Sequence, residues 1–159
     1  MLKPDEQAVA HLAAGEGEVL WVLGMFVTIK APGDDVDIYE VVCPPELGVP
    51  PNTHYKQDEA FYVLEGTFSL LAGHETIEAE AGAFVWIPRG TPHSFKNVGQ
   101  GTGKLLITST GAGFHENFFR EVGVPVGDVA EFEPPDGPPD IQKVLLSGER
   151  NDIHFAPPE

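Results

Sequence analysis

The feature that most constrains the fold of this chain is its regular punctuation by glycine and proline. The 159 residues include 18 glycines and 15 prolines, and short runs rich in Val, Ile, Phe, Tyr and Thr lie between them. Strand-sized runs at regular spacing, with turn signals between them, predict an all-β sandwich or barrel. The runs are EVLWVLGMFVTIKA (18–31), VDIYEVVC (36–43), EAFYVLEGTFSLLA (59–72), ETIEAE (75–80), AFVWIP (83–88), HSFKNV (93–98) and GKLLITST (103–110).

Helical signals come late in the chain. The segment 115–123 (HENFFREVG) has Phe118, Phe119 and Val122 at helical spacing and a glycine at its end, which favours a short helix. After a proline-rich linker (133–140), the segment 141–151 predicts a second one. We therefore expect a single domain spanning residues 1–159, with a barrel core over about 19–112 and a C-terminal helical extension over about 113–159.

The formal net charge of −16 argues against nucleic acid and anionic membranes as partners, because their phosphates would be repelled. The longest apolar run is too short to span a bilayer, and the N-terminus lacks the pattern of a signal peptide. The lone cysteine, Cys43, excludes an intramolecular disulfide framework and is expected to be a small core or strand-end residue. A cytoplasmic location is the default expectation.

Two of the expected strand starts carry polar side chains beside apolar ones. Side chains alternate between the two faces of a strand, so Asn52 and His54 point the same way, and Glu59 shares a face with residues 61 and 63. Farther on, His93 opens another run. Two imidazoles and a carboxylate that leave open positions form a ligand set suited to Fe(II) and similar divalent ions. The apolar neighbours on these faces, a candidate substrate pocket, are Phe61, Val63 and Phe95.

Five residues around His93 carry a resemblance to a known family. They form the pattern Gly-x5-Pro-x-Gly-x2-His-x3-Asn, which is similar to the second motif of the cupins at every fixed position. The resemblance implies a jelly-roll β-barrel with a metal ion inside. The five are Gly82, Pro88, Gly90, His93 and Asn97. We expect the four other than His93, together with Gly66, to form turns.

The first cupin motif, Gly-x5-His-x-His-x(3–4)-Glu-x6-Gly, can be placed in two registers. In the preferred one, His54 is the second histidine, Asn52 replaces the first, and Glu59 and Gly66 match. In the other, His54 is the first histidine and Lys56 replaces the second, which places a cation where it would repel a metal ion. By resemblance, His54, Glu59 and His93 are metal ligands, with Asn52 beside the ion as a weak fourth ligand or acting through a water.

The segment PPNTHYKQDEAFYVLEG (50–66) looks most like the single-domain, quercetin 2,3-dioxygenase-like cupins, and the resemblance extends over roughly residues 19–157. It implies one divalent metal (Fe, Mn, Ni, Cu, Co or Zn), a homodimer, and a dioxygenase acting on a small aromatic or enol-type substrate such as a flavonol, with Glu59 as a catalytic residue. Two other functions stay open: a small-molecule-binding protein without catalysis, and a redox-neutral isomerase, cyclase or lyase. Fold alone does not decide among them.

The remaining histidines lie in turn, helix-start or terminal contexts. We predict that each of them is a solvated or capping residue rather than part of the site. They are His11, His74, His115 and His154.

Overall fold

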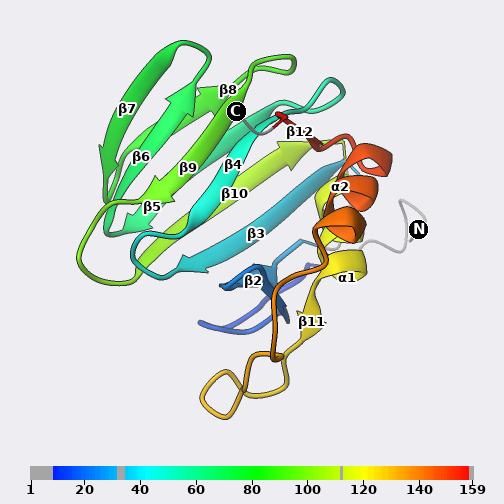
Figure 1. The fold of residues 1–159 in the computed structure, drawn as a ribbon. Coiled ribbons are helices and arrows are strands. Elements are labelled where there is room, and N and C mark those ends of the chain that lie inside the picture. The colour runs from blue at the N-terminus through cyan, green and yellow to red at the C-terminus, as the bar shows by residue number, and fades with distance from the viewer. Residues whose placement is uncertain (1–8, 32–34, 112, 158–159) are drawn as a thin grey trace.

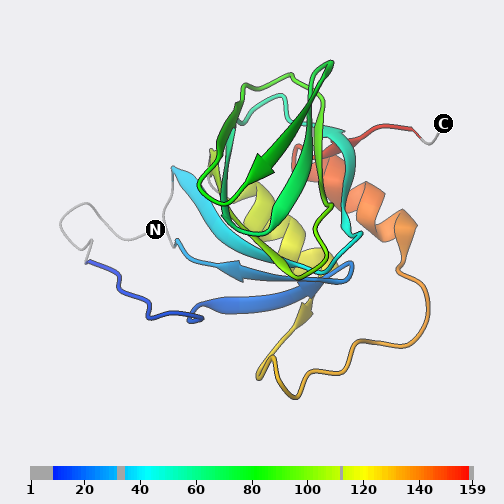
Figure 2. The same ribbon diagram turned by 90° about the vertical axis from the view of Figure 1, so that its left-hand side faces the viewer.

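The computed structural model describes residues 9–31, 35–111 and 113–157, which form two facing β-sheets and two short helices (Figures 1 and 2). The 7-stranded sheet has the order β11 (Val124–Pro125), β1 (Glu18–Val22), β2 (Met25–Ile29), β3 (Val36–Cys43), β10 (Gly103–Thr110), β5 (Glu59–Glu65) and β8 (Phe84–Ile87). The 5-stranded sheet has the order β12 (His154–Phe155), β4 (Gly48–Thr53), β9 (His93–Asn97), β6 (Thr67–Ala72) and β7 (Glu75–Glu80). All strand pairs are antiparallel. The expected β-rich fold is confirmed, and the arrangement is consistent with a jelly roll.

The core lies between the two sheets and follows from strict alternation along the long strands. In β3 and β10, every second side chain is buried, as period-2 patterning requires. Tyr39 and Ile107 face inward from this pair, and Phe68 and Phe95 meet them from the smaller sheet. Cys43 is fully buried at the end of β3, as predicted.

The N-terminal run is a hairpin and not the single strand that its composition suggested. Leu23 and Gly24, in the middle of the run 18–31, adopt φ angles of 50° and 92°. Two consecutive residues with positive φ form the tight turn that joins antiparallel strands, so β1 and β2 fold back on each other. Leucine is an unusual residue for such a turn, which is why the sequence did not reveal it.

Both helices belong to the C-terminal extension, as predicted: α1 (Phe114–Val122) and α2 (Ile141–Arg150). They lie next to each other at the end of the sheets where β10 ends and β3 begins (Figure 1). The extension also adds one short strand to an edge of each sheet, because β11 pairs with β1 and β12 pairs with β4. Within the described ranges, neither helix has the length and apolarity needed to cross a membrane.

The turn between β8 and β9 is tied to the segment that carries His54. Gly90, with a φ of 83°, donates its backbone N–H to the carbonyl of His54 over 2.6 Å. Arg89 beside it binds the Asp58 carboxylate through its backbone and its guanidinium group. These contacts fix the entry of β9 and therefore the position of His93, in agreement with the predicted turn role of the motif residues.

Candidate metal centre

Three residues that the sequence singled out meet between the sheets. His54 directly follows β4, Glu59 is the first residue of β5, and His93 is the first residue of β9. Their side chains are 2–3% exposed. The Nε2 atoms of His54 and His93 lie 3.0 and 2.8 Å from the same carboxylate oxygen, Oε2 of Glu59.

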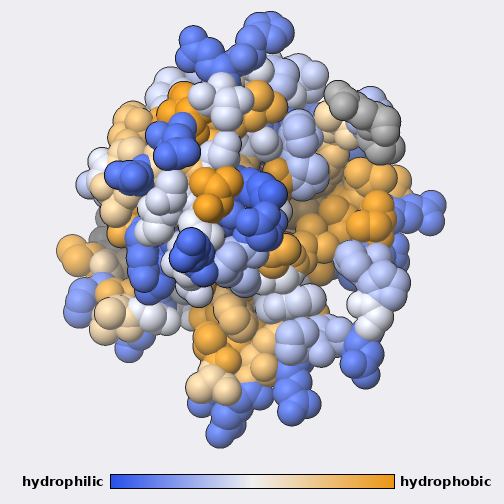
Figure 3. All heavy atoms as spheres, turned by 60° about the vertical axis from the view of Figure 1, so that its left-hand side comes forward, coloured by the Kyte–Doolittle hydropathy of each residue, from blue (hydrophilic) through white to orange (hydrophobic). Residues whose placement is uncertain are grey.

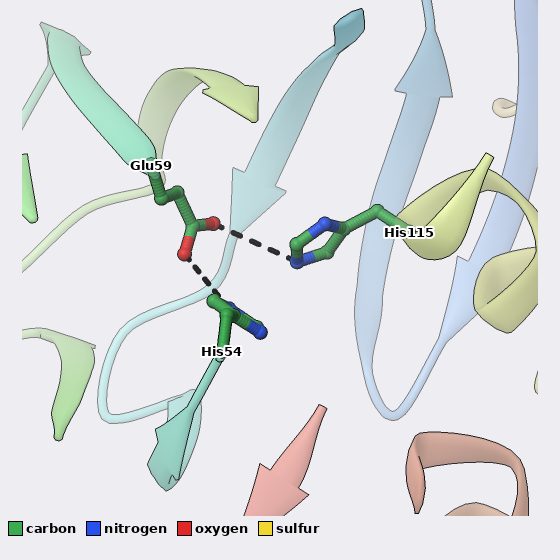
Figure 4. A group of neighbouring side chains, drawn as sticks. All are labelled: His54, Glu59 and His115. Carbon is green, nitrogen blue, oxygen red and sulfur yellow. Dashed lines mark hydrogen bonds and ion pairs between the residues drawn. The ribbon is translucent and has the colours of Figure 1, made fainter. Parts of the chain in front are cut away.

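A fourth member of this cluster, His115, was assigned to the wrong environment from the sequence. It is 5% exposed, and its Nε2 lies 3.7 Å from the second oxygen of Glu59, Oε1. Figure 4 shows His54 and His115 approaching the two oxygens of Glu59 from different elements. His54, Glu59 and His115 each offer a ligand atom within 4.8 Å of the others, which is a spacing that a single metal ion can bridge. The other three histidines fit the prediction better: His11 and His74 are exposed, and His154 lies at the surface.

The position of His115 depends on a contact between α1 and the larger sheet. The helix begins at Gly113 without a side-chain cap of its own. Instead, the buried carboxylate of Asp37, on β3, accepts hydrogen bonds from the backbone N–H groups of Gly113 (2.8 Å) and His115 (3.0 Å). A carboxylate at this position satisfies the free N–H groups of the first helical turn, and it orients His115 inward.

All three histidines present the same nitrogen to Glu59. Their Nδ1 atoms face oxygen acceptors: the backbone carbonyl of Asp152 for His54 (2.7 Å), that of Thr91 for His93 (2.9 Å), and the side-chain carbonyl of Gln57 for His115 (3.0 Å). Each Nδ1 therefore carries the proton in the neutral ring, which leaves the Nε2 lone pairs directed at the carboxylate. The Nε2 lone pairs and the negatively charged carboxylate repel one another unless protons or a cation lie between them. This set of donor atoms therefore fits a divalent metal.

The electrostatics hold two of these residues in the form that binds a metal, Glu59 as a carboxylate and His115 as a neutral imidazole. Burial by itself would raise the pKa of Glu59, but the hydrogen bonds with His54 and His93 outweigh it and hold that pKa well below its ordinary value. Burial lowers the pKa of His115 to about 3, so its imidazole is neutral near pH 7. For His54, burial is outweighed by the hydrogen bond and charge of Glu59, which raise its pKa. The carboxylate is thus ionised and holds the imidazoles around it.

Asn52 lies beside this cluster in a supporting position. It is buried and pairs with His93 across β4 and β9. Its side-chain nitrogen donates to the backbone carbonyls of Pro50 (3.1 Å) and His93 (3.3 Å). These contacts hold the start of β9; a role for Asn52 as a metal ligand stays a prediction.

A largely apolar cavity of about 60 Å³ adjoins the four clustered residues, which form part of its wall. Of the predicted pocket residues, Phe61 and Phe95 line it, whereas Val63 is buried outside its lining. Tyr39, which the sequence reasoning missed, also lines the cavity and donates its hydroxyl to Oε1 of Glu59 over 3.1 Å. The available sequence signal for Tyr39 was its position in the strand run VDIYEVVC (36–43), in which every second side chain faces the interior. Apolar side chains make up most of the remaining lining: Val22, Leu23, Met25, Val27, Val41, Val49, Ile107, Phe118, Phe119, Ile153 and Phe155.

The comparison with protein families gives a match to the Cupin_2 family, a cupin domain, over residues 39–109. This segment contains Asn52, His54, Glu59 and His93, and it ends before His115. The match and the fold together support the cupin superfamily for this chain. The narrower assignment to quercetin 2,3-dioxygenase-like cupins stays a prediction.

Individual relatives are distant. An uncharacterized protein of Methanocaldococcus jannaschii is 34% identical over 64 residues, which are 40% of this chain and 51% of that protein. The chain spans about half the length of the curated relatives it matches. An RmlC-like cupin from Shewanella frigidimarina has a TM-score of 0.57 at 18% identity, over 65% of this chain and 93% of its own. The polyketide cyclase RemF from Streptomyces resistomycificus has a TM-score of 0.57 at 21% identity, over 65% of this chain and 80% of the cyclase chain. At these identities, the two structures show the shared fold alone.

Proposed function

We propose that the protein is a metal-dependent cupin enzyme in which His54, Glu59, His93 and His115 hold one divalent ion. The observation that carries the proposal is the convergence of three Nε2 atoms on the Glu59 carboxylate, with every Nδ1 committed to an acceptor. Imidazole and carboxylate ligands suit Fe, Mn, Co, Ni, Cu and Zn. Which of these ions occupies the site is a matter for metal analysis of the purified protein.

The cavity narrows the class of substrate. A water molecule needs about 10–15 Å³ of such a cavity, so about 60 Å³ holds only a few heavy atoms, far fewer than a flavonol contains. No Lys or Arg is among the described residues that line it, so a phosphate or carboxylate group would find no counter-ion away from the metal. We therefore favour a small, mostly apolar molecule that enters with one enol or phenol oxygen toward the histidine cluster.

The proposed reaction is oxygenation of this substrate. A redox-active ion at such a site supplies open coordination positions for the substrate oxygen and for O2. Glu59 accepts the proton of the substrate hydroxyl, since a carboxylate within hydrogen-bond reach serves as a general base. Tyr39 keeps Oε1 of Glu59 oriented by donating to it, and the phenylalanines of the cavity exclude water from the reacting groups.

The activity test follows O2 consumption by protein loaded separately with Fe, Mn, Co, Ni, Cu and Zn. We expect uptake with a redox-active ion and a small enol or phenol, and slower uptake with a flavonol because of its size. Glu59→Gln should reduce the uptake to background, and Glu131→Gln, an exposed carboxylate far from the cluster in sequence, should leave it unchanged.

The other two functions predict different outcomes of the same experiment. A redox-neutral isomerase, cyclase or lyase would bind Zn on isolation and transform a substrate without consuming O2. A binding protein would retain the small enol without transforming it. Absence of uptake with every metal and every substrate of the panel would overturn the dioxygenase proposal and leave the metal site itself to be judged by affinity.

A further inference from the structure

The turn between α2 and β12 contains a buried aspartate that reaches into the metal centre. Asp152 is 4% exposed and has a φ of 58°, a left-handed conformation in which a residue with a β-carbon is uncommon. Its carboxylate accepts the backbone N–H groups of Tyr55 (3.0 Å) and Lys56 (2.8 Å). Its own backbone carbonyl accepts Nδ1–H of His54 (2.7 Å). One residue of the C-terminal extension therefore holds both the main chain after His54 and the ring of His54.

The same carboxylate determines the orientation of Gln57. The amide nitrogen of Gln57 lies 3.4 Å from Oδ2 of Asp152, and a carboxylate can only accept hydrogen bonds. The amide oxygen of Gln57 must then point the other way, toward Nδ1 of His115 at 3.0 Å. An oxygen acceptor at this position requires a proton on Nδ1 of His115 and leaves its Nε2 free for a metal.

We propose that Asp152 is the positioning residue of the metal centre, setting the ring tautomers of His54 directly and of His115 through Gln57. Asp152, Gln57 and the two histidines form one continuous chain of contacts. Both Asp152 and His115 lie outside the segment that matches the cupin domain. The C-terminal extension is thus part of the site and not only an addition to the fold. The effect on metal binding rests on the proposed function, whereas the effect on the tautomers does not.

The test is Asp152→Asn, read by long-range ¹⁵N–¹H NMR of the histidine rings in metal-free protein and by metal titration. An asparagine amide nitrogen cannot accept the hydrogen bonds that the carboxylate accepts, so Gln57 loses its fixed orientation. We expect His115 to shift from the Nδ1–H form toward the Nε2–H form, and metal affinity to fall about 10–100-fold, as it does when outer partners of ligands are changed. Asp140→Asn is the matched control, because Asp140 caps α2 through Lys143 and contacts no histidine.

A second variant separates positioning from a general loss of stability. Gln57→Ala keeps Asp152 and its contact with His54, so it should release the tautomer of His115 and leave that of His54 unchanged. It also decides the question if Asp152→Asn does not fold. If the ring tautomers in Asp152→Asn and Gln57→Ala match those of the unaltered protein, the inference is overturned. If the unaltered protein binds no metal, the proposed function fails, and the tautomer comparison still tests the role of Asp152.

A separate observation concerns the outer face of the 7-stranded sheet. In an antiparallel sheet that faces water, the outward side chains are usually polar, yet here many are large and apolar. Tyr62, Leu64, Phe84 and Trp86 lie together on β5 and β8 and are 43%, 41%, 60% and 51% exposed. Figure 3 shows that hydrophobic residues also form broad areas on the surface. Farther along the same face of the sheet are Ile38, Val42 and Leu106.

The opposite end of this sheet is already occupied. There, β11 pairs with the outer edge of β1. The ring of Phe132 packs on Trp21 and Phe26, with ring centroids 6.1 and 5.8 Å apart. The β5–β8 end is where the sheet order stops at an edge strand and where the exposed aromatic side chains are.

The family resemblance implies a homodimer, and we infer which face it uses: the two copies pack on each other through the β5–β8 face. A chain with a net charge of −16 repels its own copies, so association requires a face that carries little charge. Among the described residues, the charged side chains on this face are Glu40, Glu65 and Lys104, and Lys104 lies opposite Glu65 in the register of β10 and β5. In a two-fold arrangement, Glu40 of one copy can approach Lys104 of the other, because such an interface uses the same patch twice.

Trp86→Glu tests this interface by placing a carboxylate in the centre of the patch. We expect the unaltered protein to sediment as a dimer at tens of micromolar and Trp86→Glu to sediment as a monomer with unchanged metal content. Leu146→Glu is the matched control, since Leu146 is 50% exposed on α2. A monomeric unaltered protein, or a dimer that persists in Trp86→Glu, would overturn the inference.

Discussion

Glu59→Gln is expected to lower the affinity for a divalent metal by more than about 100-fold, beyond the range typical of outer-partner changes. The carboxylate is the one group that all three imidazoles approach, with Nε2 distances of 3.0, 2.8 and 3.7 Å. Glutamine keeps the shape but removes the negative charge, and its amide nitrogen would face the Nε2 lone pairs in place of an oxygen. The measurement is competition with a chelator of known affinity, for each metal in turn, together with the metal content of the purified protein.

The structure offers a close control for this experiment. Glu116 lies in α1, one residue from His115, and pairs with Arg120 on the helix surface. Glu116→Gln removes the same charge from the same neighbourhood without changing the cluster, and should leave the metal affinity within about twofold, because the ion pair with Arg120 lies outside the cluster. His93→Ala should resemble Glu59→Gln. A metal affinity that survives both Glu59→Gln and His93→Ala would mean that the ion binds elsewhere.

The parts of the site that lie on strands could be predicted because strand geometry is local. Glu59 and His93 begin β5 and β9, and His54 directly follows β4. The turns at Gly66, Gly82 and Gly90 have the positive φ angles that glycine adopts readily. Once the run pattern indicates facing sheets, these side chains must point to the interior. The cavity wall contributed by Phe61 and Phe95 follows from the same alternation.

His115 could not be placed in this way because its environment is set by tertiary contacts. The direction in which α1 crosses the sheets depends on Asp37, which precedes Gly113 by 76 residues, and on Gln57. One signal was available: His115 precedes Phe118 and Phe119 by three and four residues, so it lies on the apolar face of the predicted helix. Histidine on such a face is commonly a core residue, and only the approach to Glu59 distinguishes it.

The hairpin at Leu23–Gly24 was missed for a similar reason. Its flanks are apolar on both sides, so hydrophobicity alone reads residues 18–31 as one strand. The break depends on two positive φ angles, one of them at a leucine, and composition gives no indication of that. The hairpin matters for the candidate site, because Leu23, in the turn, and Met25, the first residue of β2, both line the cavity.

Asn52 and His115 are two positions at the edge of the same cluster. In the preferred register of the first cupin motif, Asn52 stands where the motif has a histidine, and the structure brings His115 to the cluster from a helix. His115→Asn should therefore lower the metal affinity by about 10–100-fold, because one Nε2 is lost while His54, Glu59 and His93 remain. Asn52→His should raise the affinity, because it adds an imidazole on a strand that already pairs with His93.

The double variant Asn52→His/His115→Asn is the decisive measurement. If the two positions serve one role, the added imidazole at 52 compensates for the one lost at 115, so His115→Asn lowers the affinity much less in the Asn52→His background than in the unaltered protein. The coupling between the two changes, measured as a double-mutant cycle, should then be clearly non-additive, whereas independent roles give additive changes. His74→Asn, at an exposed turn, controls for the loss of a histidine as such. If His115→Asn leaves the affinity of every metal unchanged, His115 is a wall of the cavity and not a ligand, and the site reduces to His54, Glu59 and His93.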